Sequence, residues 1–219
     1  MRTKLIRKKE IAEGTTEILL ERPEGFRFKP GQYALIILPE LTEGNRRELS
    51  IASSPNDEKQ LRFAFRNSES SFKKGVLKLE IGSTLEIEGP YGLFTLQKNE
   101  SNVVLIAGGI GITPFMSMMR FAAEEKAPVH ITLISINPSD EKTPFKEDLR
   151  RFEADNPNMR VVKYIGRQSS ENFLKEIPEG VERIYVAGPP GMVSKIRQTL
   201  AEGKIDEEKI LAEDFIGYA

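Results

Sequence analysis

The stretch VVLIAGGIGITPFMSMMRFA, residues 103–122, decides the fold class. Its continuous apolar opening predicts a buried strand, and the glycines that follow lead into apolar residues at helical spacing. Thr113 is suited to cap that helix and Pro114 to enter its first turn. Glycines let a backbone approach a ligand closely, and a helix N-terminus attracts anions, so the stretch predicts a phosphate-binding turn. Its spacing is not G-x-G-x-x-G, and a plain tight turn is the alternative.

Three more apolar runs, at 129–135, 161–165 and 183–187, alternate with helical patterns. Such alternation predicts a parallel sheet that is covered on both faces. The last run leads into Gly188 and Pro189 and then into a second helix around 192–202. Both glycine loops would leave the carboxyl ends of parallel strands, which is where open α/β sheets bind ligands.

The first hundred residues follow a different pattern, with short segments that alternate apolar and polar residues between turns. Period-two alternation places one face in a core and the other in water. We therefore expect about six strands and little helix, arranged as an antiparallel barrel or sandwich. The predicted strands include 4–12, 16–21, 33–37, 61–65 and 84–88. The polar stretch 97–102 marks the change, so residues 1–98 are assigned to a β-barrel domain and 99–219 to a Rossmann-like α/β domain.

Composition excludes several kinds of chemistry. The 219 residues contain no cysteine and one histidine, and 32 basic against 33 acidic side chains give a net charge of −1. Disulfides, Cys-ligated zinc, iron–sulfur clusters and a Cys nucleophile are therefore impossible, and no metal site is expected. His130 lies in a strand-like run and is interpreted as structural.

The charge balance and the hydropathy pattern also bear on partners and location. A near-zero net charge offers no global field for nucleic acid. No apolar run is long enough to span a bilayer, and residues 1–10 are too polar for a secretory signal, so a cytoplasmic protein is expected.

A second candidate site lies in RELSIASSP, residues 47–55. Arg47 could hold a phosphate through its guanidinium fork, with the Ser50 hydroxyl beside it. In a regular strand Arg47 and Leu49 share a face and Ser50 lies opposite, unless the strand bends. A surface arginine is the alternative interpretation.

Five motifs in this order resemble those of the ferredoxin–NADP reductase superfamily of flavin reductases, and the resemblance covers essentially the whole chain. They are Pro30-Gly31-Gln32, Arg47-Glu48-Leu49-Ser50, Gly89-Pro90-Tyr91-Gly92, the segment 108–114 and Ala187-Gly188-Pro189. The tail 213–218 is similar to the Glu-x-Phe-Gly endings of bacterial members.

The resemblance implies an antiparallel flavin-binding barrel followed by an NAD(P)-binding parallel sheet, with flavin and nicotinamide meeting between them. Arg47 would hold the flavin diphosphate, and a short loop would complete that site. Thr113 would lie near the flavin, Glu213 would orient the nicotinamide or relay a proton, and Tyr218 would cover the flavin; a frayed polar terminus is the alternative for the last two. The implied cofactor-binding residues are Arg47, Leu49, Ser50, Phe65, Ser71, Phe72, Lys73, Gly108, Gly109, Gly111, Thr113, Pro114, Gly188, Pro189, Met192 and Phe215.

Three positions depart from the family pattern. Leu49 replaces the tyrosine that usually stacks on the flavin, so van der Waals contact would replace aromatic stacking. Ala187 replaces the cysteine beside the nicotinamide, and Lys73 stands where serine or threonine is common.

The implied activity is an FAD-dependent NAD(P)H reductase, with FAD preferred over FMN, in which the cofactors carry the chemistry. Because the chain has no cysteine for an iron–sulfur centre, electrons would leave for a separate ferredoxin, flavodoxin or oxygenase component. The protein would be a monomer or weak dimer. NADP or NAD would be the co-substrate: the strand ending at Asn137 has no acidic residue for ribose hydroxyls, and Lys142 or Arg167 could meet a 2′-phosphate.

Three alternatives remain open. The chain could be the flavin subunit of a larger complex similar to dihydroorotate dehydrogenase. It could be a colourless dehydrogenase that acts directly on a substrate, or a nucleotide sensor that kept the fold without turnover.

Overall fold

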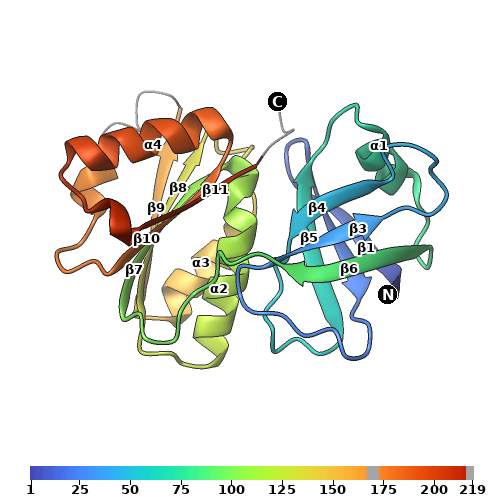
Figure 1. The fold of residues 1–219 in the computed structure, drawn as a ribbon, viewed down its shortest axis with the longest axis horizontal. Helices are drawn as coiled ribbons and strands as arrows, with labels where there is room; N and C mark the ends of the chain where they lie inside the picture. The colour runs from blue at the N-terminus through green and yellow to red at the C-terminus, as the bar shows by residue number, and fades with distance from the viewer. Residues whose placement is uncertain (167–172, 216–219) are drawn as a thin grey trace.

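The computed structural model describes residues 1–166 and 173–215, which form two domains side by side, each built on one β-sheet (Figure 1). The first domain has a six-stranded antiparallel sheet in the order β4-β3-β6-β1-β2-β5. Its elements are β1 (Arg2–Ala12), β2 (Thr15–Glu21), β3 (Tyr33–Ile37), β4 (Arg46–Ser50), β5 (Gln60–Arg66), α1 (Ser71–Lys78) and β6 (Thr84–Tyr91). The Ala52 N–H donates to the Arg62 carbonyl at 2.8 Å, so the segment after β4 meets β5 and the sheet curls into a barrel.

The second domain has a five-stranded parallel sheet in the order β11-β10-β7-β8-β9. Its elements are β7 (Asn102–Gly108), η1 (Gly109–Ile112), α2 (Thr113–Glu124), β8 (His130–Asn137), α3 (Lys146–Asp155), β9 (Met159–Ile165), β10 (Arg183–Gly188), α4 (Pro190–Glu202), η3 (Glu207–Lys209) and β11 (Ile210–Asp214). The predicted fold class is confirmed. The boundary between residues 98 and 99, which stays a prediction, falls between β6 and β7.

Two elements were absent from the sequence interpretation. Helix α1 lies in the barrel half, where little helix was expected, and β11 was interpreted as part of a polar tail. Strand β11 is short and only partly buried, because it forms the edge of the sheet. Such a strand lacks the continuous apolar run of its buried neighbours.

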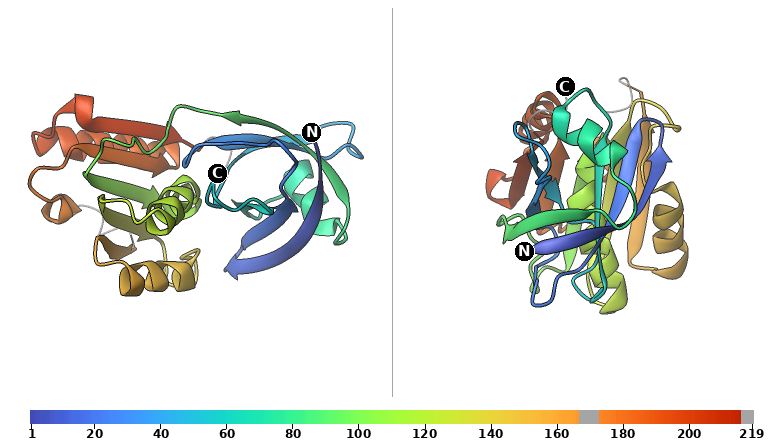
Figure 2. Two further views of the ribbon diagram at one scale, coloured as in Figure 1. Left: turned by 90° about the horizontal axis from the view of Figure 1, so that it is seen from below. Right: turned by 90° about the vertical axis from the view of Figure 1, so that its right-hand side faces the viewer.

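The parallel sheet separates two apolar cores. Along β7, Val103 and Leu105 face the core beneath α2, while Val104 and Ile106 face the core beneath α4. Figure 2 shows the helices on opposite faces of this sheet. The period-two alternation of one fully buried strand thus supplies both cores.

The core beneath α2 continues into the barrel domain. Ala52, Ala64 and Phe94 belong to the same cluster as the helix residues. The Phe94 ring lies 5.8 Å from that of Phe115 and 5.3 Å, edge-on, from that of Tyr185. Burying these rings against each other removes apolar surface from water on both sides, so the domains are packed together.

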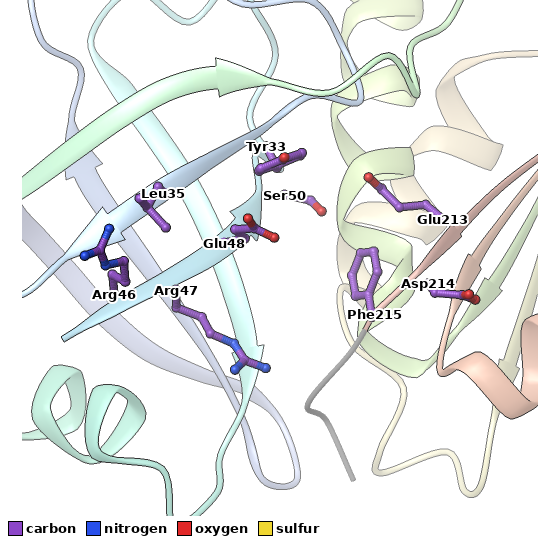
Figure 3. Close-up of a pocket in the computed structure, with 9 residues that line it drawn as sticks. All are labelled: Tyr33, Leu35, Arg46, Arg47, Glu48, Ser50, Glu213, Asp214 and Phe215. Atoms are coloured by element: carbon purple, nitrogen blue, oxygen red, sulfur yellow. The ribbon is translucent and has the colours of Figure 1, made fainter. Parts of the chain in front are cut away.

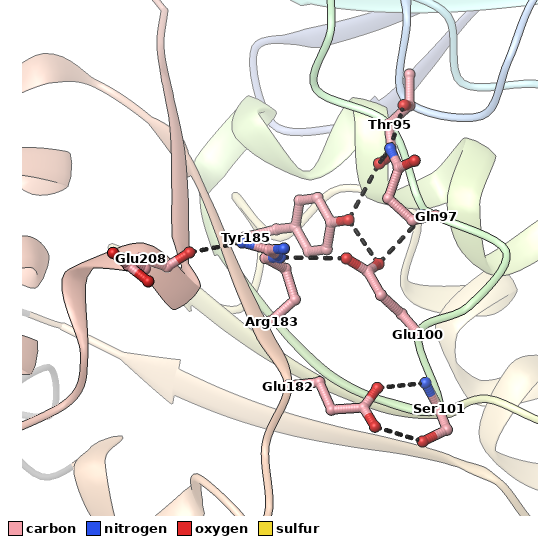
Figure 4. A network of polar contacts seen from close by, with 8 residues as sticks. All are labelled: Thr95, Gln97, Glu100, Ser101, Glu182, Arg183, Tyr185 and Glu208. Carbon is pink, nitrogen blue, oxygen red and sulfur yellow. Dashed lines mark hydrogen bonds and ion pairs between the residues drawn. The ribbon is translucent and has the colours of Figure 1, made fainter.

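A polar network fixes the linker to the second domain (Figure 4). The phenol oxygen of Tyr185 lies 2.6 Å from Glu100 Oε2 and 3.0 Å from the Thr95 carbonyl. Arg183 Nε lies 3.2 Å from Glu100 Oε1, and the Gln97 N–H donates to Glu100 Oε2 at 3.1 Å. The buried Glu100 carboxylate thus has three partners, which offset the cost of removing its charge from water.

Arg120 provides a second link between the domains. From α2 it donates to the Ala52 carbonyl of the barrel, and its guanidinium lies 3.1 Å from Asp148 of α3. It also lies 5.7 Å from the centre of the Phe145 ring. With 11 % of its side chain exposed, Arg120 is a mostly buried cation whose contacts reach both domains.

Replacing this link should weaken the whole protein. We expect Arg120→Met to lower the free energy of unfolding by about 2 kcal/mol, because Asp148 and the Ala52 carbonyl lose their donor. Urea unfolding measures the change. The exposed Arg150 of α3, paired with Glu147, gives the matched control: Arg150→Met should change stability by less than about 0.5 kcal/mol. Equal losses in both variants would contradict the assignment.

Among the described residues, no helix combines the length and apolar character needed to cross a membrane.

Candidate functional site

A pocket of about 360 Å³ opens where the barrel meets the edge of the parallel sheet (Figure 3). Its walls come from β3 and β4 of the barrel and from β11 and the residue after it. The lining residues are Tyr33, Leu35, Arg46, Arg47, Glu48, Ser50, Glu213, Asp214 and Phe215. Four of the predicted cofactor-binding or catalytic residues, Arg47, Ser50, Glu213 and Phe215, are therefore brought together from the two domains.

Strand β4 contributes Arg46, Arg47, Glu48 and Ser50 to the pocket, whereas Leu49 is 1 % exposed and belongs to the barrel core. The Leu49 side chain is not part of the pocket lining, because it points away from the face that carries Glu48 and Ser50. Its expected contact with a flavin stays a prediction.

Three cations gather at one end of the site. Lys73 is 1 % exposed, and burial, followed by the charges of Arg47 and Arg66, lowers its pKa to about 8. A lysine is so strongly perturbed only where positive charge is concentrated in a poorly hydrated place. Arg47 lines the barrel side of the pocket, and Lys73 and Arg66, which do not line it, lie close enough behind it for their charges to interact. We call Arg47, Arg66 and Lys73 the basic end.

Helix α1 contributes to the basic end. Ser70 caps it by accepting a hydrogen bond from the Lys73 N–H at 3.4 Å, so Ser71, Phe72 and Lys73 form its first turn and not the predicted loop. The first N–H groups of a helix favour anions. Phe72 and Phe65 lie in the barrel core, at 2 % and 0 % exposure, and support the site from behind.

The opposite end of the pocket is acidic. Strand β11 pairs in parallel with β10, which aligns Glu213 with Ala187 and Asp214 with Gly188. Burial raises the pKa of the Glu213 carboxyl to about 7, and the charge of Glu48 adds to the rise. Burial and both carboxylates also raise the pKa of Tyr33. We call Glu48 and Glu213 the acidic end.

Phe215 follows β11, and its N–H donates to the Gly188 carbonyl at 2.9 Å, which directs the ring into the pocket. Tyr218, expected to cover a flavin, lies outside the described residues.

The glycine-rich segment 108–111 adopts a tight helical turn, η1, directly before α2. Thr113 does not cap α2. It begins the helix, is 1 % exposed and donates its hydroxyl to the Ile110 carbonyl at 2.9 Å. The glycine turn already provides the helical entry, so no side-chain cap is required. Thr113 and the buried Pro114 do not line the pocket.

The glycines of the two loops differ in how much space a side chain would find. A Cβ on Gly111 would lie 2.2 Å from the Ala187 carbonyl oxygen, so this glycine is required for close packing on β10. Cβ atoms on Gly108 and Gly188 would meet the Met192 side chain at 2.1 and 2.6 Å. Gly109, with φ +53° and open space around it, is the position in the turn that is free to face a ligand.

These residues, with Pro189 at the N-cap of α4, gather the predicted nucleotide loops at the carboxyl edge of β7 and β10.

Two residues were expected to meet a coenzyme 2′-phosphate. Lys142 lies 3.6 Å from Glu13 of the barrel, and Arg167 is outside the described residues. The Asn137 amide donates to Ser135 Oγ at 2.9 Å. His130 is exposed at the start of β8, and the part of the chain that the structure describes contains no cluster of His, Asp or Glu suited to a metal.

Six residues of the site were missed from the sequence: Tyr33, Leu35, Arg46, Glu48 and Asp214 of the pocket lining, and Arg66 of the basic end. Glu48 stands inside the quoted motif 47–50 and Tyr33 follows the quoted motif 30–32, and strand alternation from Ser50 would have placed Glu48 in the same wall. Arg66 directly follows the predicted strand 61–65, which is a weak signal that only the fold makes clear.

Comparisons with known proteins agree with this arrangement. Residues 105–198 match the family model of the oxidoreductase NAD-binding domain. The anthranilate 1,2-dioxygenase electron transfer component of Acinetobacter baylyi is 27 % identical over 94 % of this chain and 65 % of its own length. The phenol 2-monooxygenase reductase component of a Pseudomonas species is 26 % identical over 90 % of this chain and 60 % of its own. The chain thus spans less than two thirds of these curated relatives.

Solved structures show the same fold. The Amycolatopsis cytochrome P450 reductase GcoB superposes with a TM-score of 0.87 at 24 % identity, covering 98 % of this chain and 70 % of its own. A Neisseria gonorrhoeae ferredoxin NADP⁺ reductase with bound FAD and NADP gives 0.83 at 19 % identity over 98 % of both chains.

A barrel joined to a dinucleotide-type parallel sheet, with a pocket between them, defines the two-domain class of reductase folds. The chain shares this fold with solved ferredoxin–NADP⁺ reductases, and its residues 105–198 match the oxidoreductase NAD-binding domain.

The raised pKa of Glu213 predicts a pH-dependent effect on stability. Folding moves this pKa from 4.5 to about 7, so the folded protein holds the proton more tightly and the ionised group destabilises it. That cost is absent below the unfolded value, grows as pH rises and is complete above the folded value. Glu213→Gln should therefore raise Tm relative to wild type at about pH 8 and leave it unchanged at about pH 4.

Thermal unfolding at the two pH values measures this difference. The exposed Glu80 gives the control, because Glu80→Gln should shift Tm by the same small amount at both pH values. A Glu213→Gln variant whose advantage does not grow with pH would contradict the expected linkage.

Proposed function

We propose that the chain binds FAD in the pocket between its domains and passes electrons from NAD(P)H to a separate protein acceptor. The observation that carries the proposal is the charge arrangement of the pocket, in which Arg47 of the barrel, backed by Arg66 and Lys73, lies in one wall and the carboxylates of Glu48 and Glu213 face it from both domains. A flavin dinucleotide has a matching division, with a diphosphate at one part and an uncharged ring at another. The names of the relatives, which are electron transfer or reductase components, support the same function.

The residues of the basic end fit a diphosphate. Burial, followed by the charges of Arg47 and Arg66, lowers the pKa of Lys73, so an anion bound beside these cations would favour the charged lysine. Arg47 and Lys73 would hold the diphosphate by charge-assisted hydrogen bonds, and the first turn of α1 would add its N–H groups.

The other residues would position the ring and the coenzyme. Ser50 offers a hydroxyl beside the ring, and Tyr33 and Phe215 offer aromatic surface. The loops at Gly109 and Pro189 would hold the nicotinamide nucleotide at the sheet edge. Bound flavin supplies the chemistry itself, accepting a hydride and releasing electrons singly. The protein's part is alignment of the two rings and control of charge around them.

The acceptor would be a ferredoxin, a flavodoxin or an oxygenase component, because the chain has no cysteine to ligate an iron–sulfur centre. NADH or NADPH as the preferred donor, a cytoplasmic location and a monomeric or weakly dimeric state remain predictions from the sequence.

Neighbouring lysines on α1 test the basic end. Lys73 is buried toward Arg47 and Arg66, whereas Lys74 is exposed and pairs with Glu69. We expect Lys73→Met to weaken FAD binding by about tenfold or more, the value of one charged hydrogen bond, and Lys74→Met to leave it unchanged. Titration of the apoprotein with FAD measures both affinities.

Activity is tested by mixing the FAD-loaded protein anaerobically with NADH or NADPH. Loss of the visible flavin absorbance is expected with at least one of them. The proposed function would be abandoned if the loaded protein kept its oxidised spectrum with both donors.

A further inference from the structure

Two carboxylates face one pocket from different domains. Glu48 projects from β4 of the barrel, and Glu213 projects from β11 of the parallel sheet (Figure 3). Glu213 Oε2 is buried and has no hydrogen-bond partner among the described residues. The catalytic role expected for Glu213 does not involve Glu48. The motif 47–50, in which Arg47 is the expected diphosphate ligand, does not explain why position 48 is a glutamate.

The groups around Glu213 leave its charge uncompensated. Tyr33 lies on β3, Asp214 is the next residue of β11, and Arg46 and Arg47 stand on β4 with Glu48. Of these, only Glu48 acts on Glu213 appreciably, and its effect opposes ionisation. The adjoining turn η1, Gly-Ile-Gly-Ile, has no ionisable side chain, and neither does the end of β10 beside Glu213.

Glu88 provides a useful comparison on the same sheet. Leu35 of β3 pairs with Glu48 on one side and with Glu88 of β6 on the other, so all three side chains share one face. Both glutamates are exposed, but only Glu48 lines the pocket.

We propose that Glu48 is a positioning residue whose charge keeps a proton on Glu213, so that filling the pocket with FAD takes up a proton from solvent. The inference rests on the proposed function and extends it to the charge state of the bound complex. The balance is apoprotein, FAD and a proton giving one complex, with no bond formed or broken elsewhere.

The physical reason is the removal of water. A ligand in the pocket displaces solvent from both carboxylates, which raises the cost of each charge and strengthens their repulsion. The charge of Glu48 in the same pocket then favours the protonated form of Glu213. The buried Oε2 of Glu213 is the atom best placed to keep that proton, and it would then offer an O–H to the ligand instead of a second negative charge.

A pH dependence of affinity follows. Below about pH 7 the apoprotein already holds the proton, so FAD affinity should change little from this source. Above that pH the proton must be taken up on binding, and affinity should fall by up to about tenfold per pH unit for one proton.

The test is isothermal titration of the apoprotein with FAD at about pH 8, in HEPES and in Tris, whose ionisation heats differ, so that the number of protons taken up is measured. Lys73 at the basic end also gains a proton when a diphosphate binds, because its pKa is about 8. This contribution is common to all variants with an intact basic end and cancels in comparisons among them. Wild type should take up more protons than Glu48→Gln, by up to one.

The control is Glu88→Gln, which removes a carboxylate from the same sheet face outside the pocket and should match wild type. Glu213→Gln should bind FAD with the low uptake of Glu48→Gln. Equal uptake by wild type and Glu48→Gln would overturn the inference while leaving the proposed function intact.

Two results keep the outcomes distinguishable. If Glu48→Gln does not fold, wild type and Glu213→Gln are compared at about pH 7 and pH 9. Because Lys73 contributes equally to both, an equal change in their dissociation constants excludes proton uptake at Glu213. If wild type does not bind FAD at all, the proposed function fails and this inference fails with it.

Discussion

The packing of helix α2 against the barrel is the constraint on which the site depends. Each domain supplies only one wall of the pocket, so the pocket exists only where the two domains are packed together. Apolar contacts around Phe94 and Phe115 bring the domains together, and Arg120 fixes their alignment by reaching the Ala52 carbonyl. That carbonyl lies two residues beyond Ser50, so the polar anchor and the pocket wall belong to one short segment. A shift of α2 would therefore move β4 relative to β11 directly.

The buried ionisable groups of the site lower the stability of the folded protein when they are charged. Burial and like charge destabilise the protonated form of Lys73 at one end of the pocket and the ionised form of Glu213 at the other. Elsewhere the protein pairs its buried charges, as Glu100 does with Arg183 and Tyr185. Perturbed ionisable groups cluster at sites of binding or chemistry, which accords with the ligand proposed for the pocket.

Sequence reasoning succeeded where burial decides structure. The apolar run at 103–107 predicted β7, and the alternating segments predicted the barrel strands, because a core imposes its periodicity on the residues that fill it. It was less successful at the site. Thr113 has the right residue type and position for a cap, yet the preceding glycine turn already leads the chain into the helix. Leu49 aligned with a ligand-facing position, but the local direction of β4 turned it into the core. Glu48 and Glu213 are 165 positions apart, and only the pairing of β11 with β10 brings them to one pocket.

The position of β11 has a consequence for how the protein assembles. The barrel wall of the pocket is complete by residue 50, but the opposite wall begins at residue 213. Contacts between such distant segments form late, after the intervening sheet has ordered. A barrel made during synthesis would therefore have its basic end exposed for as long as the sheet edge is missing. A ligand that needs both walls of the pocket would therefore be held only after both domains are complete.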